Sequence, residues 1–413
     1  MKMDKVAKNF MEMDALSKAL ENADPRVLGR TKHSASLIMM VSLMGVFARC
    51  ETWTMISDYA ESHLSLVKRF FPDVEEVPSH DTIRRFFCIV DTRKLEEFYR
   101  DWAKSISHAL ADATDDSGEK PLRHIAIDGK TICGAMDSKL LVKESDGELS
   151  LDQAAKYKLH MVSAYLSEEG ISLGQERVSV KHSELEAIPR LIDSLAIGEG
   201  DVVTIDAMGT HVNIAEAISV KGAKYLLEVK DNQRLLKECI MDVCRCWGND
   251  DKPARISRSS TCDKARGYIT KRKCWSCGEI AALGMLGRKW PKLQSFGKIS
   301  IERTCMKTGE VCVETHYFIS SLQNDARLIL KHKRLHWEVE NGLHWQLDVN
   351  FNEDDDRKRM NSAQNYSAIT KIVLGMLKMQ KNKLSMNRRR MLLGWNDDAM
   401  EKILRDTISY FCV

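Results

Sequence analysis

The sequence predicts an α/β protein in which a helical N-terminal region precedes a mixed-sheet core, with a β-rich insertion inside that core. Up to about residue 110, apolar residues recur at the three- and four-residue spacing of helices. From about 121 to 235, short apolar runs that suit strands alternate with amphipathic helical segments. From about 235 to 315, runs rich in Thr, Val, Ile and Cys replace this order, and long helical segments then return.

Composition limits the class of protein. With 413 residues, 44% of them hydrophobic, the chain is long enough for two or three domains with buried cores. Its net charge of +3 is too small to indicate a nucleic-acid-binding protein by itself, so any DNA-binding surface has to be local. Charged residues among the first twenty positions exclude a signal-peptide core, and twelve scattered cysteines fit a reducing compartment. We therefore expect a cytoplasmic protein without a membrane partner.

The N-terminal region, residues 1–115, is predicted to be a helical DNA-binding or DNA-associated domain. Within it, residues 77–82 have the proline and the capping residues of a turn that opens a helix. That helix carries Arg84 and Arg85, which could lie on DNA; a solvated basic face on a core helix explains them equally well. A polar stretch at 111–120, without apolar periodicity, is predicted to be a linker.

The core is predicted in two parts, at 121–235 and 321–385. Its first part contains five short apolar strands and two helices. The strands are predicted at 124–128, 159–166, 171–180, 201–206 and 224–229, and the helices at 185–195 and 212–220. Three adjacent strands followed by helix, strand, helix and strand is the order of an RNase H-like core, so we predict an RNase H-like mixed sheet.

The rest of the chain departs from this alternation. Residues 236–320 are predicted to form the β-rich insertion, after which a long helix at 324–347 and another at 362–379 resume the core. Residues 386–413 are predicted to be a C-terminal tail that is basic at first and ends in a short helical segment.

Two aspartates occupy positions that suit metal ligands. Asp128 and Asp206 each end a predicted strand, and this strand order would bring both carboxylates to the same edge of the sheet. One Asp at a strand end is more often a turn or helix cap, but two in the first and fourth strands of one sheet favour a shared site. Phosphoryl transfer on a DNA backbone uses two divalent cations about 4 Å apart, and Mg²⁺ prefers carboxylate oxygens.

A third acid is expected on the long helix at 324–347. His336 and His344 lie one turn before and after Glu340, so a regular α-helix would place these three on one face and turn Glu338 about 200° away. Glu340 is therefore the candidate metal ligand. The two histidines could assist the acids or contact DNA phosphate, although a histidine on an apolar helix is more often a core residue.

Several separate motifs, in one order along nearly the whole chain to about residue 380, resemble the transposases of bacterial insertion sequences that include the H-repeat-associated proteins. The N-terminal motifs are Asp24-Pro-Arg-Val27, Glu51-Thr-Trp53 and Val77-Pro-Ser-His-Asp-Thr82. The later motifs are Ile127-Asp-Gly-Lys-Thr131, His160-Met-Val-Ser-Ala164, Val203-Thr-Ile-Asp-Ala-Met-Gly209, Tyr317-Phe-Ile-Ser-Ser-Leu322 and the stretch from His336 to Val349, with Phe351 and Glu353-Asp354 after it.

The resemblance implies a DDE-type transposase whose catalytic and metal-binding residues are Asp128, Asp206 and Glu340. The gaps between these acids, 206 − 128 = 78 and 340 − 206 = 134, suit an insertion in the second interval. The cofactor it implies is a pair of Mg²⁺ ions, with Mn²⁺ as a substitute. The partners it implies are the terminal inverted repeats of the element, target DNA and a second copy of the chain, in the bacterial nucleoid.

The expected reaction has two steps. Water hydrolyses a strand at the terminus of the element, and the freed 3′-hydroxyl then attacks target DNA in line, with the same three carboxylates serving both steps. Lys130, next to Asp128, and Lys230, after the last core strand, lie where DNA phosphates would approach, although plain surface residues remain nearly as good an explanation.

The sequence also departs from the family pattern. Cys133 stands where relatives often have the arginine of Asp-Gly-Lys-Thr-x-Arg, and Lys333 and His336 replace a tyrosine and an arginine ahead of the glutamate. These departures concern contacts with DNA rather than the three acids.

Alternative sites and functions stay open at this point. Cys274 and Cys277, with Cys262 and the 244/246 pair, could hold zinc, but a second pair at ligand spacing is missing. The acidic run at 353–356 suits a solvated turn, and Asp348 is a minor ligand candidate. The alternative functions are an RNase H-like nuclease without strand transfer and an inactive, domesticated DNA-binding protein.

Overall fold

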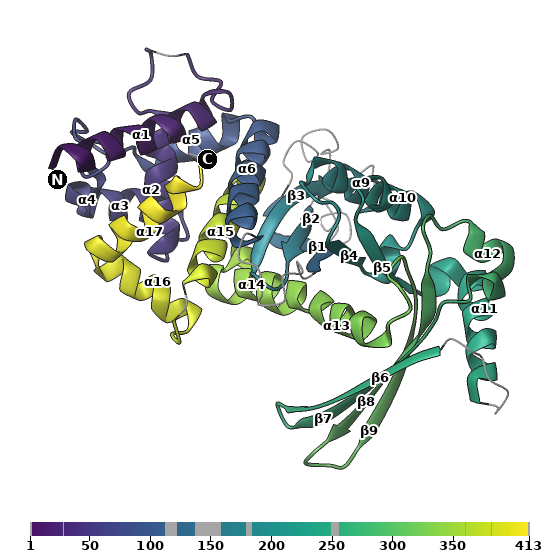
Figure 1. Cartoon of the computed structure of the whole chain (residues 1–413). Helices are drawn as coiled ribbons and strands as arrows, with labels where there is room; N and C mark the ends of the chain where they lie inside the picture. The colour runs from purple at the N-terminus through teal and green to yellow at the C-terminus, as the bar shows by residue number, and fades with distance from the viewer. Residues whose placement is uncertain are drawn as a thin grey trace, which may run out of the picture.

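The computed structural model describes residues 2–27, 29–111, 122–136, 158–178, 184–248, 256–359, 361–380 and 382–411. They form a mixed α/β molecule in which a helical body adjoins one end of a nine-stranded sheet, and four long strands project from the other end (Figure 1). The predicted linker at 111–120 lies outside this range except for Ala111, which ends a helix.

A single mixed sheet organises the molecule, in the order β3-β2-β1-β4-β5-β9-β8-β7-β6. Strands β4 and β5 run parallel to β1, and the other neighbours are antiparallel. The strands are β1 (Arg123–Met136), β2 (Lys158–Leu166), β3 (Ile171–Val178), β4 (Asp201–Ile205), β5 (Lys224–Val229), β6 (Ile256–Ala265), β7 (Tyr268–Cys277), β8 (Ser295–Cys305) and β9 (Val311–Ser320).

Strands β4 and β5 are buried over most of their length because helices cover both faces of the sheet there. The crossover helices α9 (Glu184–Ser194) and α10 (Val212–Val220) lie on one face, and α13 (Ala326–His336) lies on the other (Figure 1). The predicted hairpin of β2 and β3 and the helix–strand–helix–strand order after it are confirmed within the described residues.

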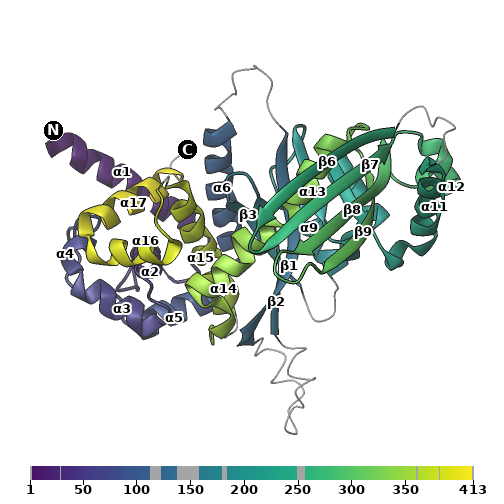
Figure 2. The same ribbon diagram turned by 90° about the horizontal axis from the view of Figure 1, so that it is seen from below.

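The helical body is built around α2 (Ala35–Phe47), in which every residue from Ser36 to Phe47 is buried. A helix that is apolar on all sides needs neighbours on all sides. Those neighbours come from both ends of the chain (Figure 2). The helices of the body are α1 (Lys2–Glu21), α3 (Trp53–Ser62), α4 (Leu64–Val67), α5 (His80–Ile89), α6 (Thr92–Ala111), α15 (Asn361–Met379), α16 (Met386–Trp395) and α17 (Asp397–Ser409).

The C-terminal segment therefore packs against the body as two helices. Arg390 on α16 is 1% exposed, its guanidinium donates to the backbone oxygens of Val46 and Asn350, and it lies 4.0 Å from the centre of the Phe351 ring. It thus ties the C-terminus to α2 and to the end of the helix that follows Glu340.

Two sequence-based expectations are corrected. Strand β1 does not end at Asp128 but continues to Met136, because β2 pairs with it along that whole stretch. The predicted helix at 324–347 is not continuous: α13 ends at His336, a π-helix spans Val339–His344, and α14 spans Trp345–Phe351. The chain thus gains one residue per turn in the segment that carries Glu340.

The insertion extends the core sheet. Helices α11 (Arg234–Arg245) and α12 (Gly284–Arg288) flank its base, while β6 to β9 run out from the core as an antiparallel arm (Figure 1). None of the helices in the described part of the chain is long and apolar enough to cross a membrane.

Candidate active site

Parallel pairing of β1 with β4 brings the two aspartates to one edge of the sheet. Ile127 is opposite Ile205, and the pairing ends there, so Asp128 and Asp206 follow on adjacent strands. Asp206 caps the short turn after β4, where its carboxylate accepts a hydrogen bond of 3.2 Å from the backbone N–H of Gly209. Asp128 lies opposite Ser163 of β2 and keeps 22% of its side chain exposed.

The acids of the site act on one another electrostatically. Burial raises the pKa of Asp128 to about 7, and the negative charges of Asp206, Glu340 and Glu184 add to this effect against an opposing hydrogen bond from Gly129. Burial also raises the pKa of Asp206, as does the charge of Glu184. The charges of these carboxylates thus act on one another and disfavour ionisation of Asp128 and Asp206.

Glu340 lies in the π-helix, with an exposed side chain, and its backbone oxygen accepts from the N–H of Trp345. The π register widens the helix at this residue, which is a geometry found frequently at functional sites. Within the described residues, no three His, Cys, Asp or Glu side chains form a ready-made metal site. The acids whose charges act on Asp128 nevertheless offer carboxylate oxygens, the donors that Mg²⁺ prefers.

The two histidines of the predicted face lie in different environments. His344 points at Asp128, with Nδ1 3.4 Å from Oδ2, and burial lowers its pKa to about 3, so it is neutral there. His336 is 8% exposed and packs against the sheet, where its Nδ1 is 2.9 Å from Thr204 Oγ1. His336 is thus part of the core beneath the site, and its predicted contact with DNA stays without support from its position.

A fourth carboxylate, Glu184, was not expected from the sequence. It begins α9, and its Oε1 lies 2.5 Å from His160 Nε2, while His160 Nδ1 lies 2.8 Å from Thr131 Oγ1. A side chain on Gly129 would place its Cβ 2.3 Å from Glu184 Oε1. The glycine after Asp128 therefore leaves room for the carboxylate of Glu184, whose approach no local pattern around residue 184 indicates.

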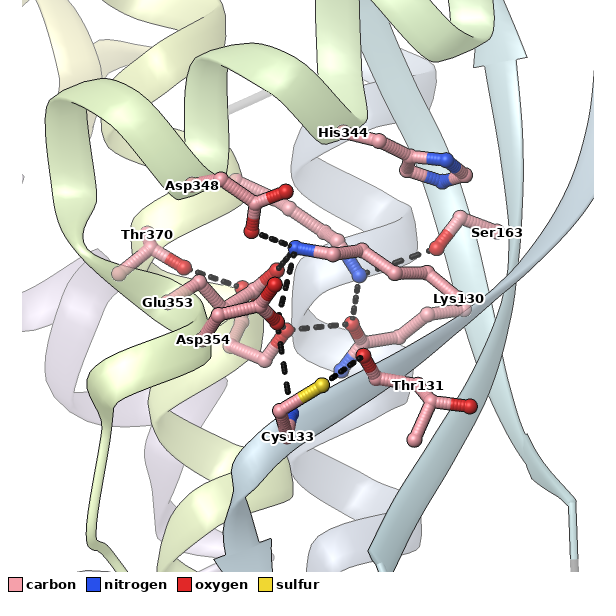
Figure 3. A network of polar contacts seen from close by, with 12 residues as sticks. Lys130, Thr131, Cys133, Ser163, His344, Asp348, Glu353, Asp354 and Thr370 are labelled. Carbon is pink, nitrogen blue, oxygen red and sulfur yellow. Dashed lines mark hydrogen bonds and ion pairs between the residues drawn. The ribbon is translucent and has the colours of Figure 1, made fainter.

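Lys130 lies in a network of acidic side chains on the other side of β1 from Glu184. Its ammonium contacts Asp348, Glu353 at 2.9 Å and Asp354 at 3.7 Å, with 13% of the side chain exposed (Figure 3). Asp348 and the acidic run therefore serve as partners of Lys130 in this structure. The lysine connects the strand of Asp128 to the segment that follows the helix of Glu340.

The other predicted DNA contacts are on the surface. Arg84 and Arg85 are exposed on α5, and Arg84 pairs with Asp81 at 3.3 Å. Lys230 is 59% exposed and lies 3.5 Å from Glu228. The positive charge of Lys230 lowers the pKa of Asp206, so Lys230 lies near the acids, whereas Arg84 and Arg85 belong to the helical body.

Two protein-family models match most of the chain. The transposase DDE domain matches residues 107–374, and the domain associated with it matches residues 20–103.

The chain belongs to the DDE transposase family.

Two relatives of this transposase chain span almost its whole length. "Putative transposase YncI" of Escherichia coli O157:H7 is 30% identical over 92% of this chain and 92% of the relative. "H repeat-associated putative transposase YhhI" of Escherichia coli K12 is 30% identical over 89% of this chain and 91% of the relative. A solved piggyBac transposase synaptic complex with hairpin DNA matches 98% of this chain and 85% of that chain, with a TM-score of 0.40 and 11% identity. This structural likeness is too weak to assign a fold or a function to the chain.

The cysteines of this DDE transposase do not form the zinc site that was considered. Cys274 and Cys277 are three positions apart on β7, so their side chains point to opposite faces of the sheet. They belong to two different buried clusters accordingly. Cys262 is exposed on the neighbouring strand. Cys274 and Cys277 are therefore core residues of the insertion.

Proposed function

We propose that this chain cuts the ends of an insertion sequence and joins them to target DNA by two-metal-ion phosphoryl transfer. The observation that carries the proposal is the parallel pairing of β1 with β4, which ends at Ile127 and Ile205 and so puts Asp128 and Asp206 at one edge of the sheet. The charge of Glu340, a third acid that is distant in the chain, also acts on Asp128. The strand order β3-β2-β1-β4-β5, with β2 antiparallel, supports an RNase H-like core around them.

Asp128, Asp206 and Glu340 are the residues proposed to hold the cations. Bound divalent ions supply charge neutralisation and polarise the attacking and leaving oxygens. Around them, Gly209 fixes the Asp206 carboxylate by its N–H, and neutral His344 lies beside Asp128 without competing with a cation. Asn232 donates at 2.7 Å to the backbone oxygen of Ala207, which holds the loop after Asp206 in place.

The proposed chemistry balances without an external energy source. In the first step a water oxygen bonds to phosphorus at the end of the element, the bond to the 3′-oxygen breaks, and a 3′-hydroxyl and a 5′-phosphate result. In the second step that 3′-oxygen bonds to a phosphorus of target DNA, a target 3′-oxygen leaves, and one phosphodiester replaces another. The proposed partners are the terminal inverted repeats, target DNA and a second copy of the chain.

A nicking and joining assay tests the proposal. The substrate is duplex DNA that carries the sequences flanking the gene, labelled at the element ends, with Mg²⁺ or with EDTA. We expect Mg²⁺-dependent nicks and joined products from wild type and neither from Asp206→Asn. Asp193→Asn, on the exposed side of α9, is the matched control and should keep both activities. Nicks without joined products would assign a nuclease instead, and no nicks at all would leave a DNA-binding protein.

The assignment of the third acid needs its own comparison. Glu338 and Glu340 are both exposed and only two residues apart, so Glu338→Gln controls for the loss of one charge at the same helix. We expect Glu340→Gln to abolish nicking and to weaken Mn²⁺ binding measured by electron paramagnetic resonance, and Glu338→Gln to do neither. The reverse result would move the third ligand to Glu338.

A further inference from the structure

The arm formed by β6 to β9 has two faces of different character. Directly paired residues share a face and successive residues alternate, so the register defines both faces. One face packs against α13 near its base, through Cys274, Ile299 and Phe318. We call the opposite side the outer face; the side chains that compose it are Arg258, Ser260, Cys262, Lys264, Ile269, Lys271, Lys273, Trp275, Lys298, Ser300, Glu302, Thr304, Val311, Val313, Thr315 and Tyr317.

The outer face is strongly basic. It carries five basic residues and one acid, the bases being Arg258, Lys264, Lys271, Lys273 and Lys298 and the acid Glu302. Lys271 pairs with Glu302 at 3.3 Å, and Lys298 lies 5.2 Å from the centre of the Trp275 ring. The remaining three bases are exposed and have no acidic partner in the described part of the chain. Three cationic groups are thus available to a ligand.

The inner face of the arm carries fewer free bases: within the described strands, exposed Arg303 is the one base on this face without an acidic partner. Arg272 contacts Asp263 at 2.5 Å, and Arg334 of α13 approaches the same carboxylate at 3.1 Å. Lys333 of α13 and His316 both contact Glu228, at 2.6 and 2.7 Å. Paired charges attract a polyanion only weakly, so the two faces differ in what they can bind although they share the same strands.

Shape and chemistry indicate the kind of partner. Four residues at alternate positions of a strand span about 20 Å, and duplex DNA carries one phosphate charge per about 1.7 Å of axis. The outer face sets its cations among the hydroxyls of Ser260, Ser300 and Thr315, which can donate to phosphate oxygens. No carboxylate apart from Glu302 interrupts this surface.

We propose that the outer face of the arm binds the sugar–phosphate backbone of duplex DNA without reading its sequence. This rests on the proposed function, because it gives the enzyme a second grip on DNA away from the three acids. A protein partner would suit the exposed valines at 311 and 313 on the free edge of β9, but these lie at one margin, whereas the unpaired bases lie on β6 and β7. Charge therefore favours DNA.

Two exposed native cysteines, one on each face of the arm, allow DNA contact to be detected by protection from alkylation. Cys262 is exposed on the outer face and Cys312, opposite Arg303, is exposed on the inner face. Wild-type protein is alkylated with N-ethylmaleimide in EDTA, with and without random-sequence duplex DNA, and each site is followed by mass spectrometry. We expect DNA to slow alkylation of Cys262 several-fold and to leave Cys312 nearly unchanged. Equal protection of both, or protection of Cys312 alone, overturns the proposal.

A charge comparison supplies the second test. The outer-face variant Arg258→Gln, Lys264→Gln, Lys273→Gln removes three bases, and the control Arg303→Gln, Lys289→Gln, Lys402→Gln removes three exposed bases elsewhere. The slope of log affinity against log salt should fall by about 3 in the outer-face variant, at about 0.9 per phosphate contact. The control should keep the wild-type slope. Equal losses in both variants refute a local contact.

The outcomes separate this proposal from the proposed function. Binding is measured in EDTA, so it does not depend on cleavage. A protein that nicks DNA but leaves Cys262 unprotected refutes the outer-face contact and keeps the transposase assignment. Protection of Cys262 in a protein that never nicks DNA keeps the outer-face contact and refutes the proposed cleavage and joining activity. If the outer-face variant changes self-association measured by sedimentation, and not the salt slope, the face joins two copies of the chain and the proposal is wrong.

Discussion

Gly129 and Glu184 approach so closely that a methyl group on the glycine would lie 2.3 Å from the glutamate Oε1, and 3.0 Å from His160 Nε2. The glycine thus lets a fourth carboxylate stand beside Asp128 and Asp206. A side chain there must displace either Glu184 with its histidine or the strand of Asp128.

Gly129→Ala should therefore impair nicking by moving Glu184, and lower the free energy of unfolding by only about 1 kcal/mol, the low end of the cost of overpacking, because the end of the glutamate side chain can shift. Gly198→Ala is the control, because its nearest neighbour would be 3.4 Å away, an ordinary contact. Adding Glu184→Ala to Gly129→Ala should restore the melting temperature. If Gly129→Ala alone melts and nicks like wild type, the close approach does not constrain the site.

The raised pKa of Asp128 predicts a pH dependence of metal binding. Burial disfavours the ionised carboxylate in the fold, so the folded state holds a proton that the unfolded state has lost, and stability falls as pH rises from about 4 through 7. A cation needs the ionised form and releases that proton. Mg²⁺ should thus raise the melting temperature more at about pH 8 than at about pH 6. Asp128→Asn should remove the difference; a Mg²⁺ effect independent of pH in wild type would contradict it.

A buried chain of hydrogen bonds under α13 should contribute strongly to stability. Thr204 Oγ1 lies 2.9 Å from both His124 Nε2 and His336 Nδ1. Thr204→Val leaves two buried imidazoles without that partner and should cost about 2 to 6 kcal/mol in chemical denaturation, at about 1 to 3 per unsatisfied group. Thr204→Ser keeps the hydroxyl and should cost less than half as much. Equal losses would mean that packing, not hydrogen bonding, sets the cost.

His332 predicts an acid-sensitive fold. It is fully buried, both ring nitrogens lack a hydrogen-bond partner among the described residues, and burial lowers its pKa to about 4. Between about pH 4 and 6.5 the unfolded state therefore binds a proton on His332 that the folded state does not bind. The free energy of unfolding falls as pH falls through this range. His332→Phe should raise the melting temperature, most at about pH 5. His80→Phe, on the surface, should not; a His332→Phe curve parallel to wild type would refute this account.

Lys130 and Lys230 should respond in opposite ways to replacement by glutamine. Lys130→Gln leaves the carboxylates of Asp348 and Glu353 unpaired and should cost about 3 kcal/mol of stability while the salt slope of DNA binding stays unchanged. Lys230→Gln, with 59% of its side chain exposed, should leave stability unchanged and lower the slope by about 0.9 if it contacts phosphate. A lower slope for Lys130→Gln would show that its ammonium leaves the network to meet DNA.

Much of the fold could be predicted because the signals were local. The β2–β3 hairpin, α10 and β5 follow from periodicity and turn residues within each segment, and the strand order after them follows from alternation. The placement of Asp128 beside Asp206 follows from that order as well. The elements themselves depend on residues close together in the chain, and the placement of the two aspartates follows from the order of those elements.

The remaining features depend on distant partners. The residues next to Glu184 in sequence do not indicate that a crossover helix brings its side chain close to Gly129. Likewise, the residues next to Arg390 do not indicate that its guanidinium donates to the backbone oxygen of Val46. Helical-wheel reasoning also failed at His336, because it assumes one uniform pitch. The pitch changes at Val339, where the π-helix begins, and a periodicity of apolar residues does not encode that change.

A π-helix contains one residue more than the α-helix that would fill the same space, so losing a single codon within 339–344 would restore a regular helix. The residues after the deletion, including Asp348 beside Lys130, would keep their places, and the sheet and the helical body would stay folded. The backbone around Glu340 would narrow, and the carboxylate proposed as the third metal ligand would change direction. Three nucleotides, without a frameshift or a stop codon, would thus impair the proposed chemistry in a gene that still encodes the other acids.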